Sequence, residues 1–248
     1  MRRLHVDVIG SGPRVVLVHG SVASGAATWA EQRVLADRFR LEIVTRPGFP
    51  PNPPVQRVDF ALDAPLVAEH LAGGDSPAHL VGHSYGGVVS LLAAAMRPEA
   101  VRSLTVVEPP CFGVAAGDPA VDRFVREYQE EVVPISDPRA RLERFLGGVG
   151  STMRLPDPLP PALAQGAQMQ IVERGPQEAE IPFAALRAAP FPKLVVSGAH
   201  HPAFDAVCDV LERELAAERA VIAGGGHSVQ RVGPPFNERL NAFLETAA

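Results

Sequence analysis

The hydrophobic pattern alternates along the chain between two kinds of segment. Short runs of apolar residues, many of them β-branched, predict strands, and longer stretches with helical spacing predict the helices between them. We expect strands near Leu4–Ile9, Arg14–Val18, Leu41–Thr45, His79–Gly82, Ser103–Val107, Leu194–Ser197 and Ala220–Ile222. We expect helices near Ala27–Arg38, Phe60–Leu71, Tyr85–Met96, Ala206–Ala217 and Phe236–Glu245. This alternation indicates an α/β fold, in which a mostly parallel sheet is flanked by helices.

The alternation stops between Pro109 and Pro192. Helical patterns follow one another there without a clear strand signal, near Pro119–Val133, Pro138–Phe145 and Pro161–Val172. A segment of this length is too long for an ordinary loop. We therefore expect residues 1–110 and 191–248 to form the α/β core, and residues 111–190 to form a helical cap. The large side chains of this segment are candidates for a pocket wall, although core packing is the simpler role for each: Phe112, Phe124, Tyr128, Phe145, Met153, Met169 and Phe183.

One short motif carries the clearest chemistry. Residues 82–87 read Gly-His-Ser-Tyr-Gly-Gly and lie between a predicted strand and a predicted helix. This is the Gly-x-Ser-x-Gly pattern in a strand–turn–helix setting. Glycine is needed at Gly82 and Gly86 because so sharp a turn leaves no room for a side chain. The turn places Ser84 at a helix start, where free N–H groups favour negative charge, and Ser84 is thus the candidate nucleophile.

A serine hydroxyl is a poor nucleophile until a base takes its proton. The candidate base is His227, which follows a predicted strand and three glycines and precedes the last helix. It therefore belongs to the same edge of the sheet as Ser84. We expect His83 to pack beneath the turn and His19 to order the loop after the second strand.

The loop His19-Gly20-Ser21-Val22 is a candidate for an oxyanion hole. A tetrahedral oxyanion needs two preorganised donors, and one of them is the backbone N–H of Tyr85, the residue after the nucleophile. The second comes from Ser21 or Val22, and we favour Ser21 because it directly follows the His-Gly pair.

These features together resemble the α/β-hydrolase superfamily. They are the His-Gly pair after a strand, the motif around Ser84, the strand that ends before Glu108, the helical insertion, and Gly226-His227 near the end of the chain. They occur in the order typical of the superfamily. The resemblance implies an α/β-hydrolase fold, a triad of nucleophile, acid and histidine, and an oxyanion hole. It does not identify a substrate.

The acid of this triad departs from the common pattern. Many members of the superfamily carry an aspartate three residues after the glycine that ends the penultimate strand, but the third residue after Gly198 is His201. We favour Glu108, which ends the strand after the motif, where certain haloalkane dehalogenases of the superfamily carry their acid. A carboxylate at the end of an apolar strand needs a partner such as His227. Asp205 is the alternative acid, and a third possibility is that neither residue serves.

The amino-acid composition limits the kinds of molecule that the protein is expected to bind. The formal net charge is −5 and the chain has a single lysine, so no basic stripe for a nucleic acid is present. No apolar run has the length of a membrane span. Cys111 and Cys208 are far apart, and His200, His201 and Asp205 lack a well-spaced third ligand, so we expect neither a metal nor a cofactor. We expect a cytoplasmic monomer or homodimer that binds a small-molecule substrate, and no nucleic acid or membrane.

The nucleophile narrows the reaction. An aspartate at this turn suits dehalogenation and standard epoxide opening, whereas a serine suits acyl transfer. We therefore predict a serine hydrolase that cleaves a carboxylic ester, lactone or thioester through an acyl-enzyme on Ser84. C–C bond hydrolysis, amide hydrolysis or a cyclisation use the same residues and stay open. A non-catalytic small-molecule binder is the alternative of another class, and the missing aspartate after Gly198 favours it.

Overall fold

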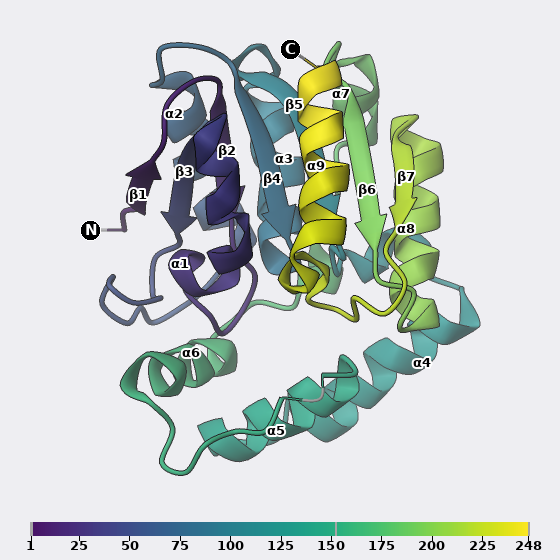
Figure 1. Ribbon diagram of the computed structural model, residues 1–248. Coiled ribbons are helices and arrows are strands. Elements are labelled where there is room, and N and C mark those ends of the chain that lie inside the picture. The colour runs from purple at the N-terminus through teal and green to yellow at the C-terminus, as the bar shows by residue number, and fades with distance from the viewer. Residues whose placement is uncertain (1, 152, 248) are drawn as a thin grey trace.

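The computed structural model describes residues 2–151 and 153–247. Seven strands form one sheet in the order β1-β3-β2-β4-β5-β6-β7 (Figure 1). Strand β1 runs antiparallel to β3, and the other neighbouring strands are parallel. The bounds are β1 (His5–Ile9), β2 (Arg14–Val18), β3 (Arg40–Thr45), β4 (Ala78–His83), β5 (Val101–Val107), β6 (Lys193–Ser197) and β7 (Glu218–Val221). The predicted α/β fold is confirmed, because the central strands β2 and β4 are buried along their whole length, as strands covered on both faces must be.

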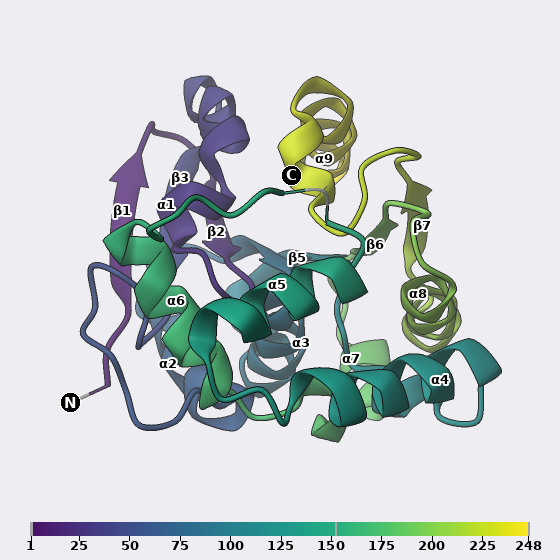
Figure 2. The same cartoon turned by 90° about the horizontal axis from the view of Figure 1, so that it is seen from below.

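Helices cover both faces of this sheet (Figure 2). One face carries α2 (Phe60–Ala72), α3 (Tyr85–Met96), α7 (Phe183–Ala188) and α8 (Pro202–Leu215). The other face carries α1 (Gly25–Thr28), the 3-10 helix η1 (Ala30–Asp37) and α9 (Pro234–Thr246). Two separate clusters of buried apolar side chains fill the spaces between the sheet and these two layers. The core therefore has the three-layer arrangement that the alternating sequence predicts.

The prediction of one α-helix over Ala27–Arg38 is wrong, because most of this stretch is a 3-10 helix. The chain forms only the short helix α1 and then the 3-10 helix η1. Trp29, Gln32 and Leu35 are spaced by three residues and are all buried. A 3-10 helix places every third residue on one face, so its tighter winding buries all three side chains together.

Helix α8 begins four residues earlier than predicted. Pro202 occupies the first turn, where its missing N–H costs no hydrogen bond. The ring of His201 accepts a hydrogen bond of 3.1 Å from the backbone N–H of Ala203 and thereby caps the helix. A histidine is an unusual helix cap, which is why the sequence pattern did not indicate this start.

Between β5 and β6 the chain leaves the sheet and forms a run of helices that we call the helical segment (residues 111–190). It contains α4 (Pro119–Glu127), a π-helical turn η4 (Tyr128–Val132), α5 (Pro138–Gly148) and α6 (Pro161–Ile171) before α7 returns to the core. Figures 1 and 2 show α4, α5 and α6 across the carboxyl ends of the strands. Short 3-10 turns complete the fold: η2 (Pro98–Ala100), η3 (Phe112–Ala115), η5 (Pro176–Glu178) and η6 (Val229–Val232).

Directly after α6, two backbone hydrogen bonds connect the helical segment to the core. The backbone N–H of Val58 donates to the carbonyl of Val172 at 3.0 Å, and the N–H of Arg174 donates to the carbonyl of Val58 at 2.8 Å. These two bonds form an isolated parallel bridge that places Glu173 opposite Val58. Within residues 2–151 and 153–247, no helix combines the length and the apolar character needed to cross a membrane.

Candidate active site

The turn between β4 and α3 holds Ser84 in a strained conformation. Its φ and ψ angles are 52° and −127°, a region that residues with a side chain rarely occupy. A Cβ atom at Gly82 would lie 2.4 Å from the carbonyl oxygen of Gly86, and one at Gly86 would lie 2.4 Å from that of His19. Both glycines are therefore required by close backbone packing. The turn presents the Ser84 hydroxyl at the N-terminus of α3.

The ring of His227 lies between the hydroxyl of Ser84 and the carboxylate of Glu108. Its Nε2 is 2.9 Å from Ser84 Oγ, and its Nδ1 is 3.5 Å from Glu108 Oε2. The backbone carbonyl of His227 also accepts a hydrogen bond of 2.9 Å from the ring of His83, which is buried beneath the turn. The structure thus brings together three side chains that are 24 to 143 positions apart in the sequence.

Glu108 follows β5 and is held by the neighbouring strand. Its φ angle is 50°, its N–H donates to the carbonyl of Val196 at 3.0 Å, and its Oε1 accepts the N–H of Gly198 at 2.6 Å. Burial raises the pKa of this fully buried carboxyl, but contacts with His200 and His227 outweigh burial and lower the pKa to about 2. The carboxylate is therefore ionised at neutral pH.

Asp205 lies in the first turn of α8 and is not brought to His227. Its Oδ1 is 3.7 Å from a guanidinium nitrogen of Arg219. The position where an aspartate is common in the superfamily holds His201, whose ring caps α8. Of the two candidate acids, Glu108 is the one beside His227.

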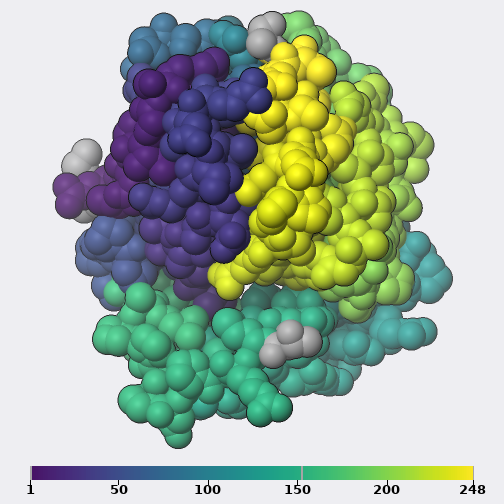
Figure 3. All heavy atoms as spheres, in the orientation of Figure 1, coloured from purple at the N-terminus to yellow at the C-terminus, as the bar shows by residue number. Residues whose placement is uncertain are grey.

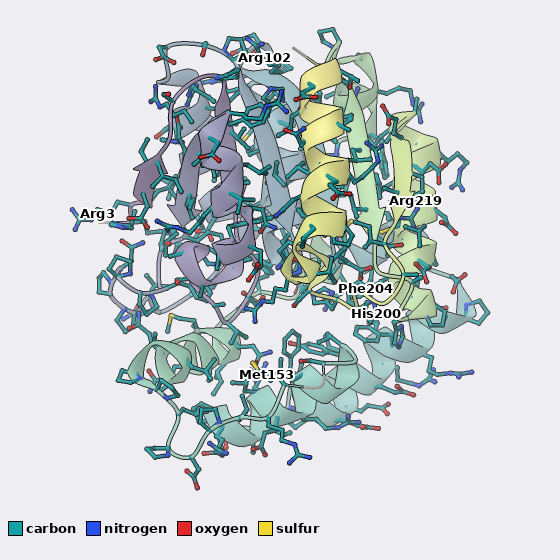
Figure 4. All side chains as sticks on the ribbon, in the orientation of Figure 1. Arg3, Arg102, Met153, His200, Phe204 and Arg219 are labelled. Atoms are coloured by element: carbon teal, nitrogen blue, oxygen red, sulfur yellow. The ribbon has the colours of Figure 1, made fainter. Side chains whose placement is uncertain are left out.

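A second histidine shares the carboxylate of Glu108. His200 Nδ1 is 3.4 Å from Glu108 Oε2, and the His200 ring lies 5.8 Å from the ring of His227. Figure 4 shows His200 beside Phe204 at the edge of the core that faces the helical segment. Sequence reasoning treated His200 only as a possible metal ligand and missed this contact, because Glu108 lies 92 positions away.

The expectation that His200 has no well-spaced ligand partners is wrong in this detail. Among the described residues, Glu108, His200 and His227 bring ligating atoms within 4.8 Å of one another. Two imidazoles and a carboxylate are a donor set that zinc accepts. A metal bound there would use the atoms of Glu108 and His227 that face each other. Metal binding would therefore replace the contact that orients His227 toward Ser84.

The loop after β2 is tied down by Arg46, which directly follows β3. The Arg46 guanidinium donates to the carbonyls of Gly20 at 2.8 Å and His19 at 3.1 Å, and it forms an ion pair of 3.0 Å with Asp63. All of these groups are buried. Sequence reasoning missed Arg46, although a charged residue directly after a buried strand at this edge of the sheet is a usable signal.

His19 orders the same loop, as the sequence predicts. Its Nε2 accepts the backbone N–H of Arg46 at 2.9 Å, so its Nδ1 carries the proton and donates to the carbonyl of Gly20 at 2.7 Å. Burial and the charge of Arg46 both lower the pKa of His19, so the ring is neutral. The loop carries Ser21 beside the Ser84 turn. Opposite it, Tyr85 is the first residue of α3, so its N–H has no partner within that helix.

A cavity lies between the core and the helical segment, and Figure 3 shows the surface hollowed between these two parts. The core contributes Ser84, His227, Ser21 and Tyr85, so the candidate nucleophile, base and oxyanion-hole residues all reach the cavity wall, whereas the candidate acids Glu108 and Asp205 do not. The full lining consists of Ser21, Ser84, Tyr85, Pro110, Phe112, Phe124, Val125, Tyr128, Phe145, Val149, Glu173, Pro176, Gln177, Phe204 and His227.

Four of the seven candidate wall residues line this cavity: Phe112, Phe124, Tyr128 and Phe145. The other three do not. Met153 is 43% exposed in a separate depression, Met169 is buried against the loop at Gly48, and Phe183 packs against the core. The sequence did not reveal which of these side chains point to the cavity, because this depends on how the helical segment packs on the core.

Glu173 is a polar group of the cavity wall that sequence reasoning missed. The Ser21 hydroxyl donates a hydrogen bond of 2.5 Å to its Oε1, and Arg46 Nη2 lies 3.7 Å from its Oε2. Burial raises the pKa of Glu173 to about 7, although Arg46 and Ser21 act in the opposite direction. No motif marks this residue, because its partner Ser21 is 152 positions away.

A serine on a strand-to-helix turn, a histidine within hydrogen-bond distance of it and a buried carboxylate behind that histidine are the arrangement shared by serine hydrolases. The model of the alpha/beta hydrolase family matches residues 15–238. The chain therefore belongs to the alpha/beta hydrolase family.

Individual relatives agree with this assignment. The pimeloyl-acyl-carrier-protein methyl ester esterase of Xanthomonas axonopodis pv. citri is 31% identical over 246 residues, which cover 91% of this chain and 92% of the relative. The enzyme of the same name from Aeromonas hydrophila is 34% identical over 143 residues, so that match spans 57% of this chain and about half, 55%, of the relative. The crystal structure of an alpha/beta hydrolase from Sphaerobacter thermophilus superposes with a TM-score of 0.70 at 22% identity, covering 97% of this chain and 96% of that chain, and shows the common fold.

Proposed function

We propose that this protein is a serine hydrolase that cleaves a carboxylic ester of a small to medium organic substrate through an acyl-enzyme on Ser84. The observation that carries the proposal is the 2.9 Å distance between Ser84 Oγ and His227 Nε2, with the ionised Glu108 behind the ring. The relatives named as methyl ester esterases support an ester as the substrate.

In the first half of the reaction, His227 Nε2 takes the proton of Ser84 while Ser84 Oγ attacks the acyl carbon. The carbonyl oxygen becomes an oxyanion, which the N–H groups of Tyr85 and Ser21 bind. Glu108 orients the ring and stabilises the imidazolium that forms. His227 then gives the proton to the leaving oxygen, and the acyl group remains on Ser84.

In the second half, His227 takes a proton from a water molecule that attacks the acyl-enzyme. The same two N–H groups bind the second oxyanion, and the acid leaves after Ser84 regains its proton. Arg46 and His19 contribute by holding the Ser21 loop in place before the substrate arrives, so little reorganisation is needed during the reaction.

We also propose that the helical segment acts as a cap, with residues 1–110 and 191–248 as the core. Its apolar side chains Phe112, Phe124 and Phe145 line the cavity above Ser84 and provide a binding surface for an acyl chain. We further propose that the protein is a cytoplasmic monomer or homodimer without a nucleic-acid or membrane partner. Size-exclusion chromatography with light scattering tests the oligomeric state.

A covalent serine probe tests the function directly. We expect a fluorophosphonate to add one adduct to the folded protein by intact-mass spectrometry, and the Ser84→Ala variant to remain unlabelled. The wild-type protein should also hydrolyse p-nitrophenyl butyrate. Comparing its kcat/KM for this ester with those for a butyryl thioester and for butyrolactone identifies the preferred bond. Absence of labelling would favour the non-catalytic binder. Labelling without turnover of any ester, lactone or thioester would favour the C–C hydrolase or cyclase.

A further inference from the structure

Glu173 is the buried carboxyl of the cavity that the proposed reaction does not use. Its side chain is 8% exposed. Its backbone is fixed by the bridge to Val58, so it belongs to the part of the helical segment that is anchored to the core. One carboxyl oxygen accepts the Ser21 hydroxyl at 2.5 Å. The other, Oε2, has no hydrogen-bond partner among the described residues.

An unpartnered buried oxygen costs free energy unless a ligand supplies the missing donor. The walls of the cavity are largely apolar, the Ser21 hydroxyl already bonds Oε1, and the Arg46 guanidinium, at 3.7 Å from Oε2, is too far away for a hydrogen bond. The Glu173 carboxyl is thus a polar group beside the Ser21 loop. The carbonyl group of a bound ester would lie against the same loop. A substrate with a hydrogen-bond donor close to that carbonyl would satisfy Oε2.

The charges nearby indicate which donor fits. The Arg46 guanidinium lies 3.7 Å from Oε2 and already provides a positive charge on that side. Arg46 would therefore repel a substrate ammonium, and Glu173 in its ionised form would repel a substrate carboxylate. A neutral hydroxyl is compatible with both protonation states of the carboxyl, because the group accepts or donates a hydrogen bond as required.

We propose that Glu173 is a specificity residue that binds a hydroxyl group of the substrate close to the scissile carbonyl. This inference rests on the proposed function, since it assigns the substrate class of the same site. The hydroxyl belongs either to the acyl group or to the alcohol that leaves, and suitable ester substrates distinguish these two sources.

The experiment compares three small esters by following acid release: ethyl butyrate, ethyl 3-hydroxybutyrate in both enantiomers, and 2-hydroxyethyl butyrate. We expect the wild-type protein to prefer one hydroxylated ester over ethyl butyrate by about 10-fold in kcat/KM, which is the usual effect of one hydrogen bond to a buried group. Preference for the hydroxybutyrate places the hydroxyl on the acyl group. Preference for the hydroxyethyl ester places it on the alcohol.

Variants connect the preference to Glu173. We expect Glu173→Leu to reduce the preference to about one, and Glu173→Gln, which keeps an acceptor oxygen, to retain part of it. Glu178→Gln is the matched control, because Glu178 is half-exposed, pairs with Arg174 and lies outside the cavity. Thermal melts verify that each variant is folded.

Two results would overturn the inference while leaving the proposed function intact. One is a wild-type protein that hydrolyses ethyl butyrate and both hydroxylated esters equally well. The other is a Glu173→Leu variant that slows all three esters by the same factor, because that would mean Glu173 only supports the Ser21 loop. A wild-type protein that hydrolyses no ester and does not react with the fluorophosphonate would overturn both proposals together.

Discussion

Two buried glutamates serve opposite sides of the same site, and their surroundings give them different charges. Glu108 belongs to the core and accepts the N–H of Gly198, with His200 and His227 against its other oxygen. Glu173 belongs to the helical segment and accepts one hydrogen bond, from the Ser21 hydroxyl. The guanidinium of Arg46 lies near it but is shared with Asp63. The pKa of Glu108 is lowered to about 2, and that of Glu173 is raised to about 7. Burial acts in the same direction on both, so the number of donors around each carboxyl decides its charge.

The site has two halves, one around each glutamate. The Glu108 half holds the base in position and is built entirely from the core. The Glu173 half adjoins the Ser21 loop and is built jointly from the core and the helical segment. Changes in the first half should alter the chemical step, and changes in the second should alter substrate choice or the placement of the Ser21 loop.

The largest effect is expected in the Glu108 half. Glu108→Gln keeps the shape of the side chain but removes the negative charge that stabilises the imidazolium of His227. We expect kcat for p-nitrophenyl butyrate to fall by about 10²–10⁴-fold, as for other triads that lose their acid. Asp205→Asn is the control and should change kcat little. The opposite ranking of these two variants would mean that Glu108 is not the acid.

The second effect is expected where the helical segment contacts the Ser21 loop. Gly166 of α6 packs so closely that a Cβ atom there would lie 1.8 Å from the carbonyl oxygen of Val22. Gly166→Ala must displace α6 or the loop, and we expect kcat/KM to fall by about 10-fold or more because the oxyanion donors move. Gly147→Ala in α5 is the matched control, since a Cβ atom there meets nothing within 4 Å. It should leave kcat/KM unchanged and stabilise the fold by up to about 1 kcal/mol. Equal activity of the two variants would show that α6 does not set the loop position.

A smaller effect is expected at His200, a positioning residue that acts through Glu108. Its contact lowers the pKa of the Glu108 carboxyl, so His200→Ala should raise that pKa. Protonation of Glu108 should then lower kcat/KM at a higher pH than in the wild-type protein, so the loss should be up to about 10-fold in mildly acidic solution and smaller at neutral pH. His200→Asn, which keeps a polar side chain near Glu108, should restore part of both. An unchanged pH profile in the alanine variant would show that His200 only fills space.

The smallest effect is expected in stability against pH and concerns Glu173. Between about pH 4.5 and 7 the folded protein keeps the proton on Glu173, whereas the unfolded chain has lost it. The stabilisation is therefore complete below pH 4.5 and is lost as pH rises through 7. Compared with Glu173→Gln, the wild-type protein should lose roughly 1–3 kcal/mol of unfolding free energy between pH 4.5 and 8.

Urea unfolding at a series of pH values measures this difference. The buried rings of His79 and His83 have pKa values lowered by burial, so they make the fold more stable as pH rises toward 6.5. Both proteins contain these rings, and the subtraction removes their contribution. Parallel stability curves for the two proteins would show that Glu173 titrates at its ordinary pKa and would remove the contrast with Glu108.

Much of the fold was predictable because it depends on local patterns. The seven strands were visible as apolar runs, since a strand covered on both faces has few polar positions. The turn at Ser84 was visible because only glycine fits at positions 82 and 86. The 3-10 helix η1 was not predictable, because its tighter winding depends on burying Trp29, Gln32 and Leu35 against other elements.

The sequence by itself determined which strand each candidate catalytic residue follows. The nucleophile follows β4, a carboxylate follows β5 and a histidine follows β7, each at the carboxyl edge of a parallel sheet. Only the tertiary structure decided that Glu108 rather than Asp205 meets His227, that His200 shares this carboxylate, and that Glu173 meets Ser21. The physical reason is distance along the chain. A glycine turn acts over a few residues, whereas contacts between residues about 90 to 150 positions apart depend on how the packed layers and the helical segment bring their side chains together.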